Sequence, residues 1–230
     1  MLNLNALIPE KITLSSREVA LMVDKRHDHL IRDIETYMKQ MEEANKTLTP
    51  NLGAVNEEPS ILRNHINPKG YFIKSSYKDS TGKKNRCYKI TKMGCDFIAH
   101  KMTGVKGTAF TAGYIKKFYE MESKLKLELQ TKEDFKEMTA AIKQVKENPK
   151  PYNFSNEVNM INKIALGRTS KQFKIQNNIL EKDNIGKYLS YEQLQLIDIL
   201  QKLNASMILL QMDYEERKAR LQDYRLKLAA

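Results

Sequence analysis

Residues 15–34 read SSREVALMVDKRHDHLIRDI and contain the signals of two helices joined by a tight turn. Ser15 can cap the free amides of a first helical turn, and Glu18, three residues later, completes a capping box. A second helix is predicted from about Arg26 to Glu43, because apolar residues recur there at helical spacing. Its inward-facing positions are Leu30, Ile34, Tyr37, Met38 and Met41. The chain is therefore expected to begin with a helix–turn–helix.

A β-hairpin with a basic tip is predicted further along the chain. Residues 71–77, YFIKSSY, and 85–90, NRCYKI, favour strands, and KDSTGKK between them is rich in turn residues. The polar, proline-containing residues 44–69 before the hairpin predict a loop. Thr91 should cap a further helix that Gly104 and Gly107 end, and a long helix should begin at about Phe110.

The second half of the chain predicts helices only. The apolar stripe of the long helix suits either a coil between two subunits or packing within its own domain. Pro149 and Pro151 indicate a linker, because proline cannot continue a helix. Thr169 and Ser190 each begin a capping box, and residues 191–210 carry a broad apolar face. These features favour an interaction or oligomerisation domain, with a purely stabilising domain as the alternative.

The predicted fold class is α+β. A winged-helix-like N-terminal domain (helix–turn–helix plus β-hairpin) is expected over residues 1–123. A long connecting helix and linker follow over 124–151, and an all-α C-terminal domain over 152–230.

Composition excludes several classes of protein. The chain has 230 residues, of which 41% are hydrophobic and 29% charged, and no stretch approaches the roughly 20 apolar residues of a membrane-spanning helix. Residues 1–9 lack the pattern of a secretion signal. We therefore expect a cytoplasmic protein without a membrane partner. Cys87 and Cys95 are too few for a disulfide framework, and we expect reduced structural thiols, with a redox switch as the alternative.

Positive charge is concentrated in one segment. The formal net charge is +11, and residues 63–106 hold eleven Lys or Arg against only two acids, Asp79 and Asp96. Such a cluster favours a polyanionic partner, although a solvated basic surface would give the same composition.

Two groups of side chains are candidates for contact with double-stranded DNA. A helix fits the major groove with its first residues against base edges, and a basic hairpin can lie along phosphates. The first group lies at the start of the second helix and comprises Lys25, Arg26, His27, His29 and Arg32. The second group lies in the hairpin and comprises Lys78, Lys83, Lys84 and Arg86. An ordinary helical hairpin with an exposed charged face is the alternative.

Other chemistries receive little support from the sequence. Tyr71, Tyr77 and Tyr88 could stack on single-stranded bases, but packing under the sheet is favoured. His27 and His29 are two residues apart on a helix and point in different directions, which disfavours a shared metal. The chain has no phosphate-binding loop, no G-x-S-x-G and no H-E-x-x-H. We therefore expect no catalytic residues, no cofactor and no metal, and keep a metal-dependent nuclease as the third alternative.

Two blocks of sequence resemble the phage Rha regulatory family. These blocks are SSREVALMVDKRHDHLIRDIETYMKQ and SSYKDSTGKKNRCYKITKMGCDFIAHKMTGVKGTAFTAGYIKKFYEME, which cover most of residues 12–123. In the second, the YKDS-turn-G block, the Y-x-I-T-K-x-G-C step and the T-G-x-K-G-x-x-F stretch match in order and spacing. Near the other end, the stretches INKIALGRTSKQFK, YLSYEQLQLIDILQKLN and DYEERKARLQDY resemble a helical domain at the end of various phage regulatory and antirepressor proteins.

The resemblance implies a phage or prophage transcription regulator with a winged-helix-like DNA-binding region. The matching positions are residues 24–32 and 75–90, and the family transfers no catalytic residues. Residues 44–69 form a longer connection than the usual one in the family. The main alternative is an antirepressor that binds a phage repressor protein, and either version is expected to form a homo-oligomer.

Overall fold

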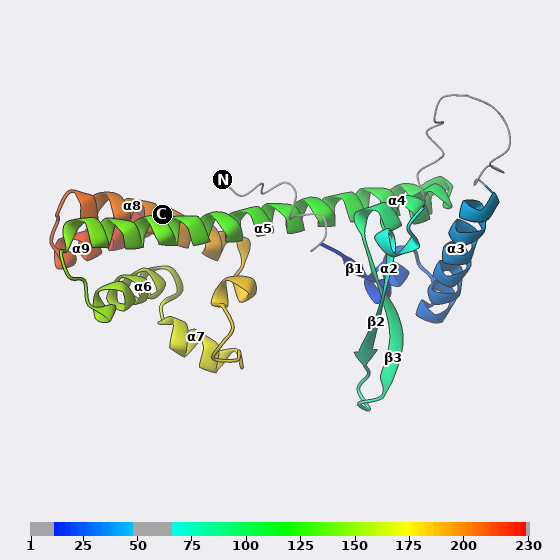
Figure 1. Ribbon diagram of the computed structural model, residues 1–230, viewed down its shortest axis with the longest axis horizontal. Coiled ribbons are helices and arrows are strands. Elements are labelled where there is room, and N and C mark those ends of the chain that lie inside the picture. The colour runs from blue at the N-terminus through cyan, green and yellow to red at the C-terminus, as the bar shows by residue number, and fades with distance from the viewer. Residues whose placement is uncertain (1–11, 48–65, 229–230) are drawn as a thin grey trace, which may run out of the picture. The chain divides into compact units, whose positions relative to one another are not determined.

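The computed structural model describes residues 12–47 and 66–228, and their fold is α+β, as predicted (Figure 1). The chain forms two compact units that divide between Glu122 and Ser123. We call them the N-terminal and the C-terminal unit.

The N-terminal unit combines four helices with a small antiparallel sheet. Its elements are β1 (Leu14–Ser15), α2 (Ser16–Met22), α3 (His27–Thr47), the 3-10 turn η2 (Pro68–Gly70), β2 (Phe72–Lys78), β3 (Lys84–Ile90), α4 (Lys92–His100) and the first half of α5 (Gly104–Val145). The strand order is β1-β3-β2, and β2 and β3 form the predicted hairpin.

Helices α2 and α3 with the turn between them form as the sequence predicts. The Ser15 side chain accepts from the backbone of the first turn of α2, and the Glu18 carboxylate accepts from the Ser15 N–H at 3.1 Å. This capping box satisfies donors that the helix start leaves free. Asp24 in the turn adopts a left-handed conformation with φ of 53°, which Asp tolerates better than most residues. The chain can therefore reverse within a few residues before α3.

The core of the N-terminal unit lies between the helices and the sheet. Leu30, Ile34 and Met41 of α3 are buried, as predicted, while Tyr37 and Met38 are half-buried. Helix α5 adds a row of buried aromatic rings, one per turn, at Phe110, Tyr114 and Phe118.

Two predicted boundaries differ from the structure. Helix α3 continues to Thr47, into the segment predicted as a loop, and the loop residues 48–65 lie outside the described residues. Helix α5 begins at Gly104 and includes Gly107, so Gly107 does not break a helix. A Cβ at Gly107 would lie 3.1 Å from the backbone of Met102, so glycine lets α5 begin close to Met102 without crowding.

The C-terminal unit is all-helical over its described residues. It contains the second half of α5, then α6 (Pro151–Leu166), α7 (Ser170–Gln176), the 3-10 turn η3 (Ile185–Tyr188), α8 (Tyr191–Leu209) and α9 (Tyr214–Lys227). The capping boxes at Thr169 and Ser190 are present, as predicted. Met138 and Ile142 of α5 pack in the same core as Leu194 of α8. The division of the chain into three domains stays a prediction.

Candidate nucleic-acid interface

His27, the first residue of α3, is held by contacts within the N-terminal unit. Its Nε2 lies 2.9 Å from Ser16 Oγ, and that oxygen accepts the backbone N–H of Tyr88 at 3.0 Å. The Ser16 hydroxyl accepts this N–H and can donate its own proton to His27 Nε2. Burial, and after it the Arg17 guanidinium, lower the pKa of His27, so the ring is neutral at pH 7. The ring also packs edge-on against Tyr77, and His27 thus anchors α3 to α2 and the hairpin.

The cations at the start of α3 are paired with carboxylates of the same segment. Lys25 donates to Asp33 at 2.8 Å, and this hydrogen bond raises the pKa of Lys25. Asp28 accepts from Arg26 at 3.1 Å and lies 3.5 Å from the guanidinium of Arg32. All of these side chains are at least one-third exposed. Such surface pairs contribute only about 0–1 kcal/mol, so a phosphate can compete for the cations.

His29 lies next to this group of ion pairs. Its side chain is about half exposed, and its Nε2 is 3.7 Å from Asp28. Unlike His27 it has no second contact among the described residues that would fix the ring. Of the two histidines, His29 is therefore the one free to meet a ligand.

The hairpin tip is organised around one carboxylate. Asp79 accepts the backbone N–H groups of Thr81 and Lys83, each at 3.0 Å, and also the Thr81 hydroxyl at 2.6 Å. The Asn85 side chain donates to its other oxygen at 2.7 Å. These bonds lower the pKa of Asp79, the Thr81 hydroxyl contributing most. The tip is thus a folded turn that sets the direction of its lysines.

Four basic side chains of the hairpin strands, Lys74, Lys78, Lys84 and Arg86, lie on one face, whereas Lys89 pairs with Ile73 on the other. Lys78 lies directly opposite Lys84, and the next pair on that face is Ser76 with Arg86. The guanidinium of Arg86 donates to Glu35 of α3 at 2.9 Å. The face that carries Lys78 and Lys84 is therefore turned toward α3.

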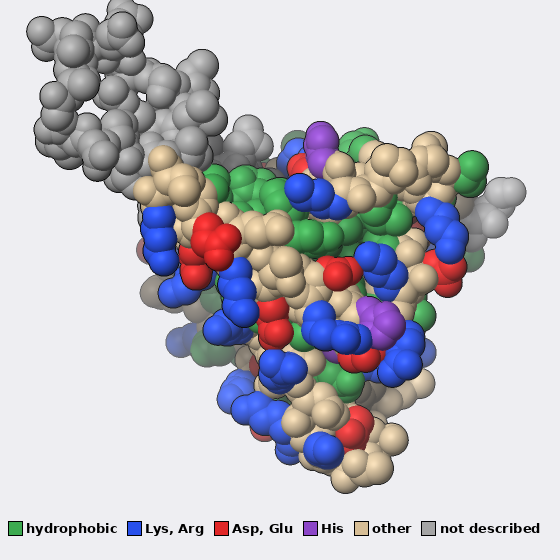
Figure 2. Space-filling view, turned by 90° about the vertical axis from the view of Figure 1, so that its right-hand side faces the viewer, with side chains coloured by type: hydrophobic (Ala, Val, Ile, Leu, Met, Phe, Trp, Pro, Cys, Tyr) green, Lys and Arg blue, Asp and Glu red, His purple; other side chains and the backbone are tan. Residues whose placement is uncertain are grey.

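The start of α3 and the hairpin lie on one side of the unit. The His27–Tyr77 contact joins the first residue of α3 to the far part of β2. In Figure 1 the early, darker end of α3 and the hairpin tip are directed to the same side. Figure 2, which faces the right-hand side of Figure 1, shows Lys and Arg side chains down to the lower end of the unit, with Asp and Glu side chains among them. The two predicted groups of candidates thus lie on neighbouring elements of the unit.

Charge on this surface is unequal between the two elements. Helix α3 is slightly acidic, with Asp28, Asp33, Glu35, Glu42 and Glu43 against Arg32, Lys39 and Lys46. The hairpin has one acid, Asp79, against Lys74, Lys78, Lys83, Lys84, Arg86 and Lys89. The excess positive charge therefore comes from the hairpin and from the turn before α3.

Three further cations lie near this surface and were not singled out in the sequence. Arg17 of α2 stacks over the Tyr77 ring, with its guanidinium carbon 4.4 Å from the ring centre. Lys74 and Lys89 are exposed on β2 and β3. Lys74 pairs with Tyr88 and Lys89 with Ile73, so the two lysines lie on opposite faces and strand alternation does not predict the exposure of both. The Arg17 contact depends on tertiary packing.

The remaining candidates follow the packing interpretation. Tyr88 is buried, and the half-buried rings of Tyr71 and Tyr77 pack against Phe97 and His27 respectively. Within residues 12–47 and 66–228, no three His, Cys, Asp or Glu side chains group closely enough to hold a metal ion. In the same residues no helix is both long and apolar enough to cross a membrane.

Cys87 and Cys95 are buried free thiols, and burial raises the pKa of Cys95 to about 12.

Comparisons with known proteins match the N-terminal half. The sequence profile of the family described as phage regulatory protein Rha matches residues 14–123. The chain is similar to YoqD of Bacillus subtilis (strain 168), whose full name is SPbeta prophage-derived putative antirepressor protein YoqD. The two are 38% identical over 116 residues, which cover 50% of this chain and 38% of YoqD. No solved structure shows significant similarity to the chain.

Proposed function

We propose that this chain, whose residues 14–123 match the profile of the phage regulatory protein Rha family, is a member of that family and binds double-stranded DNA through its N-terminal unit. In this proposal the first turns of α3 enter the major groove and the hairpin cations lie along the phosphates. The protein would act in the cytoplasm of a bacterial host as a regulator of phage transcription.

One observation carries the proposal: Arg86 and Tyr77 of the hairpin contact Glu35 and His27 of α3. These contacts support the proposal because they hold the hairpin beside α3, although Arg86 and Glu35 are 51 residues apart in sequence. Arg26 and Arg32 remain exposed there for base edges or phosphates, and Lys83 and Lys84 for phosphates. His27 is left out of the DNA-contacting set, because its ring is engaged within the unit.

A titration at two salt concentrations tests DNA binding. Fluorescence anisotropy of a labelled mixed-sequence duplex should show binding that weakens as salt rises. Lys83→Ala with Lys84→Ala should reduce affinity and lower the slope of log K against log salt by about one for each phosphate that the variant no longer reaches. Arg26→Ala should reduce affinity most for duplexes that carry the preferred site, which duplexes from the control region of the phage can supply.

The matched control changes two exposed lysines of the C-terminal unit, Lys143→Ala with Lys146→Ala. It removes the same net charge and should leave binding almost unchanged. If both double variants lose the same affinity, the net charge of the protein alone explains the loss, and the hairpin lysines have no specific role. A chain that binds no duplex even at low salt excludes the proposal.

A second candidate is an antirepressor that binds a phage repressor protein, as the name of YoqD suggests for that relative. The purified repressor of the same phage should then co-elute with the full chain in size-exclusion chromatography. The Lys83/Lys84 double variant separates the candidates, because the complex with the repressor should survive it while DNA binding falls.

We also propose that the protein is a homo-oligomer. On the N-terminal part of α5, Val105, Ile115 and Tyr119 are exposed by 86%, 50% and 72%. Together with Ala112 they are successively seven, three and four residues apart, which is the spacing of a heptad seam between helices. They lie on the side of α5 away from the buried rings of Phe110 and its neighbours.

A further inference from the structure

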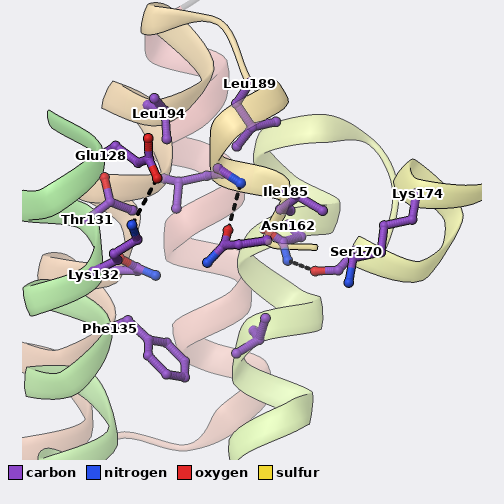
Figure 3. A pocket seen from close by; sticks show the side chains of 15 residues that line it. Glu128, Thr131, Lys132, Phe135, Asn162, Ser170, Lys174, Ile185, Leu189 and Leu194 are labelled. Carbon is purple, nitrogen blue, oxygen red and sulfur yellow. Dashed lines mark hydrogen bonds and ion pairs between the residues drawn. The ribbon is translucent and has the colours of Figure 1, made fainter. Parts of the chain in front are cut away.

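The C-terminal unit contains a pocket that DNA binding and the family do not account for. Its volume is about 310 Å³, and its walls come from α5, α6, α7, η3 and α8 (Figure 3). All of these elements belong to the same compact unit, so the pocket is formed within it.

The pocket has an apolar floor and an aromatic wall. Leu189, Leu194 and Ile197 line it and are nearly fully buried. Phe135 of α5 keeps 38% of its surface exposed, and Figure 3 shows its ring directed away from α5 into the space. A volume near the lower end of ligand pockets, about 300 Å³, suits a compact molecule with one ring system rather than a peptide helix.

A buried polar group in the wall lacks a partner. Gln201 of α8 lines the pocket and is only 8% exposed, and its Oε1 accepts no hydrogen bond from the described residues. A buried amide oxygen without a hydrogen bond destabilises the folded protein, and a donor from a bound ligand would offset this loss. The terminal torsion of a glutamine is soft, so the carboxamide can turn toward such a donor.

Charge in the lining is not balanced. Lys132 donates to Glu128 at 2.9 Å, which neutralises both. Lys174 of α7, across the pocket from Lys132 in Figure 3, has no carboxylate partner among the described residues and donates only to the backbone carbonyl of Glu181. The pocket therefore carries one excess positive charge at Lys174.

We propose that this pocket binds a small aromatic carboxylic acid with a ring N–H group. The ring lies on the apolar floor against Phe135, the N–H donates to Gln201, and the carboxylate pairs with Lys174. The proposal does not depend on DNA binding, because every residue it uses lies in the C-terminal unit.

Indole-3-acetate is a suitable probe, because the protein contains no tryptophan. Indole emission, excited where tyrosine does not absorb, then reports on the ligand alone. Addition of the full-length protein should shift the emission to the blue and raise its anisotropy in a saturable way. Neutral indole should bind more weakly, and so should 1-methylindole-3-acetate, which lacks the donor.

Two variants test the two polar contacts. Lys174→Met keeps the apolar stem and should weaken indole-3-acetate binding about tenfold while leaving neutral indole unaffected. Lys171→Met is the matched control, because Lys171 is an exposed lysine of the same helix outside the pocket. In Gln201→Leu, indole-3-acetate and its N-methyl derivative should bind equally well. Circular dichroism of each variant without ligand checks that it is folded.

Three results would overturn the proposal. The first is no saturable binding of indole-3-acetate to the full chain. The second is equal binding of indole and indole-3-acetate, which removes the role of Lys174. The third is an equal loss of affinity in Lys174→Met and Lys171→Met, which reduces the effect to general charge.

Discussion

Asp79 carries the negative charge of the hairpin tip, but its hydrogen bonds also hold the turn that presents the basic side chains around it. Electrostatics alone predicts that Asp79→Ala strengthens DNA binding, because the variant removes a carboxylate that would repel the phosphates. The bonds to Thr81, Lys83 and Asn85 predict the reverse, because a loosened tip must be ordered again on binding. We expect affinity to fall by about two- to tenfold, measured by anisotropy with the same duplex.

Ser80→Ala is the control for that experiment, because Ser80 is an exposed tip residue outside this set of bonds. It should bind like the unaltered protein. A rise in affinity for Asp79→Ala would mean that the tip acts through charge alone.

Asp134 of α5 forms a buried pair of carboxyl groups with Asp198 of α8. Asp134 is 1% exposed, and Asp134 Oδ2 and Asp198 Oδ1 both accept no hydrogen bond from the described residues. Burial, and then the hydrogen bond with Asp198, raise the pKa of Asp134 to about 6, although Lys202 acts in the opposite direction. A proton shared between the two carboxyl groups explains both free oxygens.

This pair predicts a pH dependence of stability. A pKa that is raised in the folded state gives stability that is complete below about pH 4 and is lost as pH rises through about 6. Asp134→Asn mimics the protonated acid, so it should be more stable than the unaltered protein above pH 7, by on the order of 2 kcal/mol. Urea unfolding at pH 5 and pH 8 measures this difference. A variant that behaves like the unaltered protein at both pH values would exclude the shared proton.

Contacts within one helical turn were predictable from the sequence, whereas contacts between distant residues were not. Ser15 and Glu18 were predictable as a capping box because both partners lie within one helical turn. The engagement of His27 was not predictable, because its partners Ser16 and Tyr77 meet it only through the fold. For the same reason the pairing of Asp134 with Asp198 has no signal in the local sequence.

At the scale of elements, α4 packs on the hairpin through a glycine. A Cβ at Gly94 would collide with the backbone carbonyl of Tyr71 and lie 2.8 Å from Ile90, so Gly94→Ala must push α4 away from the sheet. We expect it to lower the free energy of unfolding by about 1–3 kcal/mol. Hydrogen exchange of the amides in β2 and β3 should become faster, which mass spectrometry measures.

Gly113 of α5 provides the matched comparison. A Cβ there would meet only the flexible end of Met22, at 3.2 Å, and alanine favours a helix interior by about 1 kcal/mol. Gly113→Ala should therefore leave stability unchanged or raise it. If both alanine variants behave alike, α4 does not depend on the close approach at Gly94.

Elements were predictable where their signals are local. The hairpin is predicted by strand-forming residues around a turn, and the start of α4 by Thr91, which caps it. The start of α5 was predicted six residues late, because Gly107 was interpreted as a helix breaker. The close approach of Gly107 to Met102, which favours glycine inside the helix, has no signal in the sequence. The pocket of the C-terminal unit, built from five separate elements, has no pattern in the sequence.

At the scale of the whole molecule, self-association is the next property to test. Ile115→Asp with Tyr119→Asp places charge in the exposed seam of α5 and should convert a dimer into a monomer. Light scattering coupled to size-exclusion chromatography measures the mass. Leu226→Asp, at a residue 71% exposed on α9, is the control and should not change it. A monomeric unaltered protein would contradict the prediction directly.

The ion pairs at the start of α3 have a consequence for how such a protein would recognise a duplex. A Lys or Arg that is paired with a carboxylate must give up this ion pair in order to bind a phosphate. The carboxylate that loses its partner then attracts a small cation from solution. Part of the entropy that DNA gains by losing its counterions is thereby returned. In the proposed complex the hairpin lysines would attach the protein to any duplex, whereas α3 would gain only where the bases offer more than Asp28 and Asp33 already give. Acidic residues in a recognition helix would thus discriminate against the wrong site.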